Sequence, residues 1–419
     1  MRNDWCVTPL SKCLSKVIDY RGKTPKKLGG DWARKGYRAL SANNVKFSGL
    51  DKLDSINYVD EELYKKWMKE EIRRGDLLLT SEAPSGQVML WDSDEKIVLS
   101  QRLYALRPAS NVDNKYLKYY LQCPIGQKEI FRNNSGSTVA GISAKTFSNI
   151  LVRHPTKSCQ KAIGDLLYLL DKKIDCNNRI NAELESMAKT LYDYWFVQFD
   201  FPDANGKPYQ SSGGKMVYNA TLKREIPAGW RHSTIGETFK THLGGTPSRE
   251  QVEYWTPGEV NWLSSGENPS LFVVDPDERI SKLGLQNSPA KLLPQGTVIL
   301  SIVRHLRASI LGIEAATNQS VVGILETGKL KHSLIYPYLV REIPRLMALR
   351  TGAQQPHINK GVLDESLLVL PDESTLEAYT NLAAPLFLQI KNHHQQNREL
   401  TQLRDWLLPL LMNGQVTVA

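Results

Sequence analysis

The sequence predicts an α+β protein in which one α/β unit is used twice, each copy being followed by a long helix. Two observations predict this: a co-linear internal repeat, and a helical spacing of apolar residues in mid-chain that recurs at the C-terminus. The expected parts are a first α/β segment (1–155), a central helix (156–198), a linker rich in Gly, Pro, Ser and Asn (199–229), a second α/β segment (230–371) and a C-terminal helix (372–419).

The repeat rests on matched residues whose offsets drift only between about 216 and 225 positions along the chain. The matches are Trp5 with Trp230, Thr24 with Thr246, Trp32 with Trp255, Ser41 with Ser264, residues 75–80 with 296–301, Leu151 with Leu367, and Arg179 with Arg398. A co-linear series at a nearly constant offset indicates that one structural unit was duplicated.

Both long helices carry an apolar seam with alternating spacings of four and three, which is typical of a coiled coil. The first seam runs through Ile163, Leu167, Leu170, Ile174, Ile180, Leu184, Met187, Leu191 and Trp195, and the second through Tyr379, Ala383, Leu386, Ile390, Leu400, Leu403, Leu407 and Leu410. We expect helices over about 157–197 and 375–412 that pair antiparallel as a coiled coil.

Each helix becomes polar near its centre. The first does so at Asn177, Asn178 and Asn181, and the second at His393, His394 and Asn397. In an antiparallel pair these patches would meet, and buried polar residues in a seam fix its register at some cost in stability. The alternative is that they face solvent at a break in the seam, and the sequence leaves both open.

The charge of the chain points to a polyanionic partner for its first segment. The formal net charge is +9, and residues 1–155 hold 26 Lys and Arg against 17 Asp and Glu, so the excess lies there. Five cysteines without a C-x-x-C pair predict free thiols. No apolar run reaches the roughly 18–20 residues of a membrane span, and no signal peptide is visible, so a cytoplasmic location is expected, with no membrane partner.

Motifs for catalysis are missing. The chain has no Walker A sequence, no G-x-G-x-x-G after a strand and no adenine-methylating N/D-P-P-Y/F. Pro202-Asp203 precedes Lys207, but Asn205 stands where a metal-dependent nuclease needs an acid. The adjacent His393 and His394 would point about 100° apart on a helix, whereas a metal pair needs i, i+4 spacing. No catalytic residue and no metal site are therefore predicted.

Polar and basic loops instead occupy equivalent places in the two halves. Arg and Lys suit guanine and phosphate, Asn and Gln suit adenine, and Ser and Thr suit phosphate oxygens. The candidate DNA-binding residues are Lys23, Thr24, Lys26, Lys27, Ser41, Asn43, Asn44, Ser81, Glu82, Ser85, Gln101 and Arg102 in the first half, and Thr246, Ser248, Arg249, Ser264, Ser265, Glu267, Asn268, Arg304, His305, Arg307, Gln319, Gln354 and Gln355 in the second.

The whole chain resembles the specificity (S) subunit of type I restriction–modification enzymes. The motif over residues 178–202, which includes Asn178-Arg179 and Tyr192-Asp193-Tyr194-Trp195-Phe196, looks like the central conserved region of that family. Residues 79–86 and 317–320 resemble recurrent pieces of its target recognition domains. The resemblance implies that segments 1–155 and 230–371 are target recognition domains, each reading one half of a split site on double-stranded DNA.

The resemblance also implies partners. The two helical regions would dock two methyltransferase (M) subunits, and restriction (R) subunits could join. This chain would be non-catalytic and would bind no cofactor, with S-adenosylmethionine, ATP and magnesium bound by the partner subunits. The residues expected to dock subunits are Leu184, Met187, Leu191, Tyr194, Trp195, Phe196, Leu403, Trp406 and Leu407.

Two other functions compete with this prediction. One is a coiled-coil scaffold or protein-interaction module without sequence-specific DNA binding. The other is a stand-alone nuclease or methyltransferase, which the missing motifs disfavour. DNA binding of the chain with its partners, and methyl transfer by the purified chain alone, separate the three.

Overall fold

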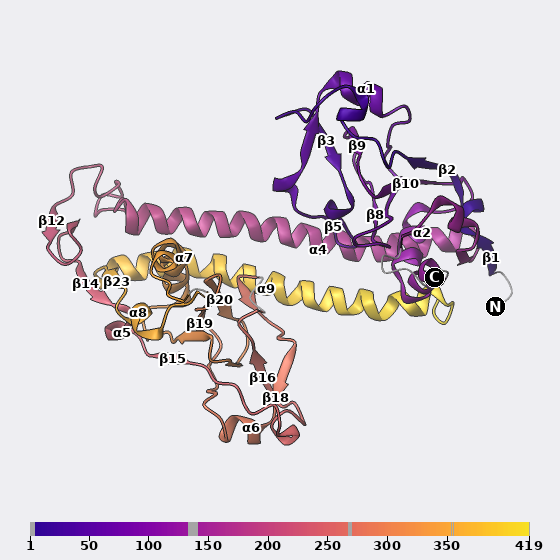
Figure 1. Ribbon diagram of the computed structural model, residues 1–419. Helices are drawn as coiled ribbons and strands as arrows, with labels where there is room; N and C mark the ends of the chain where they lie inside the picture. Colours follow the sequence, from indigo (N-terminus) through magenta and orange to yellow (C-terminus); the bar gives the residue numbers. More distant parts are fainter. Residues whose placement is uncertain (1–4, 133–140, 267–269, 353, 355, 419) are drawn as a thin grey trace. The chain divides into compact units, whose positions relative to one another are not determined.

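The polypeptide forms two units, and each is built from segments that lie far apart in the sequence. The computed structural model describes residues 5–132, 141–266, 270–352, 354 and 356–418. Unit 1 comprises residues 1–173 and 400–419, and unit 2 comprises residues 174–399. The two longest helices, α4 (Lys157–Tyr192) and α9 (Glu373–Met412), therefore contribute to both units (Figure 1).

Unit 1 contains a larger antiparallel sheet and a smaller mixed sheet. The larger has the order β2 (Leu14–Asp19), β10 (Leu103–Pro108), β7 (Leu77–Thr80), β8 (Val88–Leu90). The smaller has the order β6 (Asn57–Val59), β3 (Tyr37–Leu40), β9 (Ile97–Leu99), with β3 parallel to β9. Two strand pairs and three helices complete its described part: β1 (Cys6–Pro9) with β11 (Leu151–His154), β4 (Val45–Lys46) with β5 (Gly49–Leu50), α1 (Glu61–Trp67), α2 (Asn114–Gln122) and α3 (Pro124–Phe131).

Unit 2 also contains a larger and a smaller sheet, and both are mixed. The larger has the order β15 (Thr241–Leu243), β22 (Val321–Ile324), β19 (Val298–Ser301), β20 (Arg307–Leu311), β17 (Phe272–Val273), and the smaller the order β18 (Glu278–Ile280), β16 (Val260–Leu263), β21 (Ala316–Thr317). Its other elements include β14 (Arg231–Thr234) paired with β23 (Leu367–Leu370), α5 (Ile235–Thr238), α6 (Lys282–Gln286), α7 (His332–Ala348) and α8 (Lys360–Asp364).

The two units share the topology of their sheets, apart from the pair β4–β5, which among the described residues only unit 1 has. Strands β2, β10, β7 and β8 correspond in order to β15, β22, β19 and β20, and the parallel pair β3–β9 corresponds to the parallel pair β16–β21. The antiparallel pair β1–β11 corresponds to β14–β23. The predicted repeat is thereby confirmed. Unit 2 differs in adding β17, and in having the single helix α7 where unit 1 has α2 and α3.

The central strand β7 illustrates why the apolar runs form strands. Leu77, Leu78 and Leu79 are all fully buried, because both faces of the strand are covered. Leu77 and Leu79 belong to the core that α2 and the start of α4 complete, whereas Leu78 belongs to a second core beneath α1. A strand that is buried on both faces needs a continuous apolar run, as residues 77–79 provide.

The end of α9 completes the first of these cores in unit 1. Leu411 and Met412 are buried there beside Ile163 and Leu167 of α4. Asp171 of α4 ties the helix in place, because it accepts from Lys118 Nζ at 2.7 Å, Tyr119 Oη at 2.5 Å and Arg404 Nη1 at 2.9 Å. Burial raises the pKa of Asp171, but the charge and hydrogen bonds of these neighbours outweigh burial and hold the pKa below its ordinary value.

In unit 2 the polar centres of the two helices face each other, as an antiparallel pairing predicts. Asn177 Nδ2 donates to Gln396 Oε1 at 2.7 Å and to Asn397 Oδ1 at 2.8 Å. Asn397 Nδ2 donates to the Asn178 side chain at 2.8 Å, and His393 Nδ1 lies 2.8 Å from Asn181 Oδ1. Asn177 and Asn181 are buried, so these two do not face solvent, whereas Asn178 is exposed.

Acidification is expected to destabilise unit 2 through His394 of α9. Its ring lies 6.5 Å from that of Phe272. Burial, and secondarily the neighbouring His393, lower the pKa of His394 from the ordinary 6.5. The unfolded chain takes up a proton as the pH falls through 6.5 while the folded unit resists it, so stability that is complete above this pH is lost below it.

The measurement is thermal unfolding across about pH 5 to 8. The Tm of the unmodified chain should fall more steeply on acidification than the Tm of His394→Asn. His232→Asn is the matched control, because His232 is exposed on β14. A His394→Asn variant that keeps the full pH slope would contradict the assignment.

The segment predicted to be a linker contains a hairpin, although its sequence shows no strand period, and it packs on unit 2. After α4 and one π-helical turn (Asp193–Val197), the chain forms the hairpin β12 (Met216–Asn219)–β13 (Arg224–Pro227). Phe199, Phe201 and Ile226 are buried against Trp195 and Trp230. The segment has too few apolar residues to show a period, but three of them are sufficient to anchor it.

Candidate nucleic-acid interface

Four loops of unit 1 meet at one end of its sheets. They are residues 20–28 after β2, 41–44 after β3, 81–87 after β7, and 100–102 between β9 and β10. Because β2 and β7 are antiparallel to β10 and β3 is parallel to β9, these ends lie at one edge. Backbone bonds connect the loops: Ala42 N donates to Gln101 O at 3.2 Å, and Ser81 N donates to Arg102 O at 2.9 Å.

The equivalent loops of unit 2 meet in the same way. They are residues 244–248 after β15, 264–266 after β16, 302–306 after β19, and 318–320 between β21 and β22. Gly245 N donates to Thr317 O at 2.8 Å, Asn318 N to Leu263 O at 2.9 Å, and Ile302 N to Ser320 O at 2.9 Å. The bond from Ile302 repeats the bond from Ser81 in unit 1. The bond from Asn318 likewise repeats the bond from Ser100 N to Leu40 O in unit 1, at 2.8 Å, so each unit presents a loop cluster joined by two equivalent backbone bonds.

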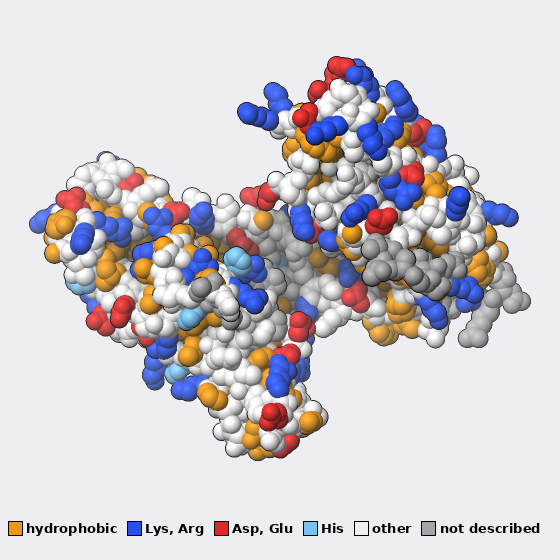
Figure 2. Space-filling view, viewed as in Figure 1, with side chains coloured by type: hydrophobic (Ala, Val, Ile, Leu, Met, Phe, Trp, Pro, Cys, Tyr) orange, Lys and Arg blue, Asp and Glu red, His pale blue; other side chains and the backbone are white. Residues whose placement is uncertain are grey.

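The structure brings the candidate DNA-binding residues of unit 1 together on its four loops. Those with exposed side chains are Lys26, Lys27, Asn43, Gln101 and Arg102. Thr24, Glu82 and Ser85 are partly buried, and Glu82 forms an ion pair with Arg102 at 3.4 Å. In the lobe that carries α1, Lys and Arg side chains are spread over the visible surface (Figure 2). The cluster thus offers cations and amides to an anionic ligand.

Two of these predicted residues point inward, and their assignment is corrected. Asn44 is buried, and its Oδ1 accepts from the Ser41 backbone N at 3.0 Å and from Ser41 Oγ at 2.9 Å. Its Nδ2 donates to Asp51 O at 3.2 Å. Ser81 is completely buried at the end of β7. Asn44 and its partner Ser41 hold the loop after β3 in shape, and neither Asn44 nor Ser81 can reach a base from this position.

Lys23 also makes contacts within the protein. Its Nζ donates to Trp67 O at 2.9 Å and lies 4.5 Å from the centre of the Tyr20 ring. Burial, and secondarily the positive charge of Lys69, lower its pKa. Lys26 and Lys27 are the more accessible cations on this loop.

A basic hollow of about 260 Å³ lies among the loops of unit 2. Among its lining residues are four predicted ones, Ser265, Arg304, His305 and Arg307. The side chains of Arg304, His305 and Arg307 are exposed at its wall. A concave site with several cationic donors suits a phosphate or the edge of a guanine base.

The other candidates of unit 2 have mixed roles. Thr246 Oγ1 donates to Gln319 Oε1, which joins two loops of the cluster. Arg249 is engaged within the protein, because it forms an ion pair with Glu278 at 2.8 Å and stacks 3.6 Å above the Trp255 ring. Ser248 and Gln354 are exposed, Ser264 is partly buried, and Glu267, Asn268 and Gln355 lie outside the described residues.

The residues predicted to dock subunits divide into two groups. Met187, Tyr194, Leu403 and Trp406 are exposed, and Leu191 and Leu407 are partly buried. Leu184, Trp195 and Phe196 are buried in the core of unit 2. The ring centres of Trp195 and Phe196 lie 5.7 Å and 4.7 Å from that of Tyr379 on α9, because the seam brings the two helices into contact.

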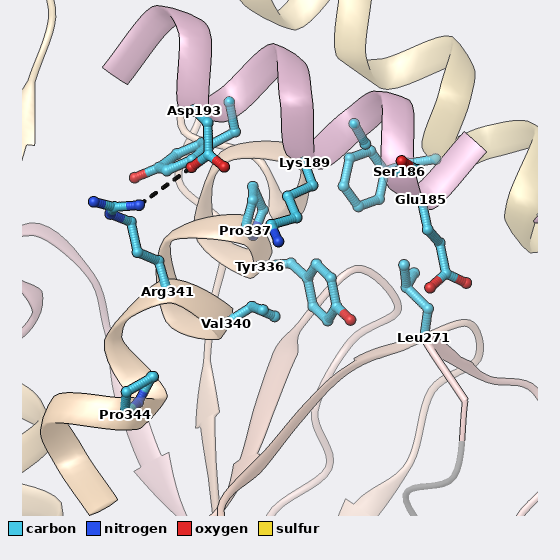
Figure 3. Close-up of a pocket in the computed structure, with 13 residues that line it drawn as sticks. Glu185, Ser186, Lys189, Asp193, Leu271, Tyr336, Pro337, Val340, Arg341 and Pro344 are labelled. Carbon is cyan, nitrogen blue, oxygen red and sulfur yellow. Dashed lines mark hydrogen bonds and ion pairs between the residues drawn. The ribbon is translucent and has the colours of Figure 1, made fainter. Parts of the chain in front are cut away.

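A pocket of about 540 Å³ lies between α4 and α7 in unit 2 (Figure 3). Glu185, Ser186 and Lys189 reach it from α4, and Tyr336, Pro337 and Val340 from α7. Asp193 and Arg341 form an ion pair at 3.4 Å at its edge. Burial raises the pKa of Glu185. The contribution of α7 was not predicted, because no seam or motif of the sequence singled out residues 332–348.

Other kinds of site are missing from the described part of the chain. It contains no group of three or more His, Cys, Asp or Glu side chains arranged to hold a metal ion. Among the helices described, none is long and apolar enough to span a bilayer.

Comparisons with known proteins agree with this repeated architecture. The type I restriction modification DNA specificity domain matches residues 11–186 and again residues 227–401. The MjaIX specificity subunit of Methanocaldococcus jannaschii is 23% identical over 86% of this chain and 82% of its own length, and the HindI specificity subunit of Haemophilus influenzae is 21% identical over 83% and 88%. The S subunit of M. genitalium shares the fold, with a TM-score of 0.62, 14% identity, and coverage of 98% of this chain and 97% of that one. The predicted relationship is confirmed, and the chain belongs to the family of type I restriction–modification DNA specificity subunits.

Proposed function

We propose that each unit reads one half of a bipartite site on double-stranded DNA through its loop cluster. The main observation behind this proposal is that the two units present equivalent loops at the same end of their sheets, and that two backbone hydrogen bonds between these loops recur in both units. Because the chain holds two such DNA-recognition units, we expect its DNA site to consist of two half-sites, separated by base pairs that neither unit contacts. The chain itself performs no chemistry in this proposal.

The side chains of the loop clusters suit both contacts to phosphates and contacts to base edges. Lysines such as Lys26 and Lys27 suit phosphates, and this contribution makes binding depend strongly on salt. The arginines of the hollow in unit 2 suit base edges, where Arg pairs with guanine. Unit 1 would therefore contribute much of the sequence-independent affinity, in line with its basic excess.

The same proposal assigns the exposed helical residues to partner subunits. Met187, Tyr194, Leu403 and Trp406 form apolar contact points, and the pocket between α4 and α7 adds an apolar recess with charged edges. Two methyltransferase subunits and the restriction subunits are the expected partners, and S-adenosylmethionine, ATP and magnesium are expected to bind to them. A cytoplasmic complex without membrane attachment fits a DNA ligand.

Lengthening both long helices together tests the proposal. Four residues inserted between Lys173 and Ile174, matched by four between Glu399 and Leu400, fall at the boundary between the units and leave the described contacts within each unit in place. One helical turn adds about 6 Å, which equals roughly two base pairs. Footprints of the complex with methyltransferase subunits should show unchanged half-sites and a spacer that is longer by about two base pairs.

The footprint experiment also decides against the scaffold alternative. A scaffold without sequence-specific DNA binding would give no protected sequence even with partners present. Protected half-sites with an unchanged spacer would leave DNA reading intact but refute the role of the helices in spacing them. A matched insertion within the exposed hairpin turn at residues 220–223 is the control, because this turn is remote in sequence from both loop clusters.

A further inference from the structure

The backbone of Arg304 in unit 2 has a conformation that a side chain other than glycine seldom adopts. Its φ is +55°, in the left-handed region, where a Cβ atom crowds the backbone. Glycine would occupy such a position without strain. A non-glycine residue held in this region at a candidate binding site is a reason to look for a role of the side chain.

The equivalent position of unit 1 is left-handed as well. Counting from the ends of the matched strands β7 and β19, Arg304 corresponds to Ala83, whose φ is +45°. The anchoring bonds also match: Ile142 N donates to Ser81 O at 2.9 Å, and Ile358 N donates to Ile302 O at 3.0 Å. The fold thus sets the backbone at this position in both units, whereas the side chain differs. The side chain is a methyl group in unit 1 and a guanidinium group in unit 2. Such a difference is expected at a position that determines which base each unit recognises.

Arg304 is fixed on both sides of its backbone. Its N–H donates to Pro356 O at 2.7 Å, and its carbonyl accepts from Arg350 Nη1. Arg350 stands just beyond α7, where its Nε donates to Met347 O at 2.9 Å. Arg350 is partly buried, whereas Arg304 is exposed at the wall of the hollow. The guanidinium of Arg350 therefore binds within the protein, whereas the guanidinium of Arg304 is accessible to a ligand.

We propose that Arg304 recognises a guanine in the half-site bound by unit 2, and that Arg350 is its positioning residue. Arg350 holds the Arg304 carbonyl, and thereby the direction in which the Arg304 side chain leaves the loop. The planar fork of Arg304 then meets the O6 and N7 atoms of guanine in the major groove. This inference rests on the proposed function, since it names the base and the residues for one loop cluster.

The test uses the complete chain in complex with its methyltransferase subunits. Binding is measured to duplexes that carry the footprinted site, and to duplexes in which each base pair of the unit 2 half-site is changed in turn. Arg304→Ala should lose about 5- to 150-fold of discrimination at one G·C pair and little elsewhere. Arg350→Ala should lose discrimination at the same pair, and Arg350→Lys should restore part of it.

The double variant and a matched control exclude a general structural effect. Arg304→Ala combined with Arg350→Ala should discriminate no worse than Arg304→Ala alone, to within about twofold, because both changes remove one contact. Arg345→Ala is the control, since Arg345 belongs to α7 but binds Glu342 and Ser366 rather than the loop. It should leave discrimination unchanged.

Hydrogen exchange of the backbone amides separates the inference from the proposed function. Arg350→Ala should speed exchange at residues 302–306, and Arg345→Ala should not. Unchanged exchange in Arg350→Ala overturns the positioning role. Faster exchange with intact discrimination overturns it too, while DNA reading by unit 2 stands. Equal losses on every duplex in Arg304→Ala would assign Arg304 to a phosphate and overturn the guanine contact, and no loss at all would remove this loop from the DNA interface.

Discussion

Removing residues 400–419 is expected to unfold unit 1 and to leave unit 2 folded. Leu411 and Met412 are buried in the core of unit 1, and burying each such side chain contributes about 1.5–3 kcal/mol. The truncation also removes Arg404, one of the donors to the buried Asp171 carboxylate. Together these losses rival the roughly 5–15 kcal/mol by which a whole domain is stable. Hydrogen exchange should find unit 1 unprotected and unit 2 protected in the truncated chain.

Single substitutions are expected to destabilise unit 1 to different degrees, according to the burial of the side chain that is changed. Leu411→Ala should lower the free energy of unfolding of unit 1 by about 2–5 kcal/mol, because it leaves a cavity in a packed core. Leu403→Ala and Trp406→Ala alter the same helix at exposed positions and should change that free energy by less than about 0.5 kcal/mol. If the truncated chain protects α2 and β7 as well as the complete chain does, the C-terminal segment is not part of the folding unit.

The fold could be predicted because its strongest signals are long or repeated. The seams of α4 and α9 extend over many turns, and the match between residues 75–80 and 296–301 marks equivalent central strands, β7 and β19. The polar helix centres could be paired because an antiparallel arrangement places them opposite each other, as Asn177 and Asn397 now are. At these positions the local sequence pattern agrees with the tertiary packing, and a fold can be predicted from sequence where the two agree.

The hairpin of residues 216–227 and the burial of individual site residues could not be predicted. A strand of four residues such as β13, in which only Ile226 and Pro227 are buried, shows no period. Asn44 and Asn43 are adjacent amides in one loop, yet one closes a capping interaction and the other is exposed, and composition does not distinguish them. Trp195 lies in the seam and is therefore covered by α9, although its residue type also suits an interface. Only tertiary contacts decide such cases.

Arg307→Ala and Lys26→Ala are expected to weaken DNA binding in different ways. Arg307 lines the basic hollow of unit 2, so its loss should cost about 1–3 kcal/mol on the cognate site and less on DNA with an altered unit 2 half-site. Lys26 is exposed on the loop after β2 and suits a phosphate. Its loss should weaken binding to all sequences alike, and should reduce the salt slope by about one.

Binding isotherms of the complex with methyltransferase subunits, taken over a range of salt concentrations, measure both effects. The two variants are each other's controls, because each removes one positive charge from an exposed position. A purely electrostatic interface would give them the same salt slope and the same loss on every duplex. Equal losses of affinity that do not depend on the DNA sequence would therefore contradict base recognition by unit 2. If the hollow recognises bases, the loss of affinity in Arg307→Ala must depend on the sequence of one half-site.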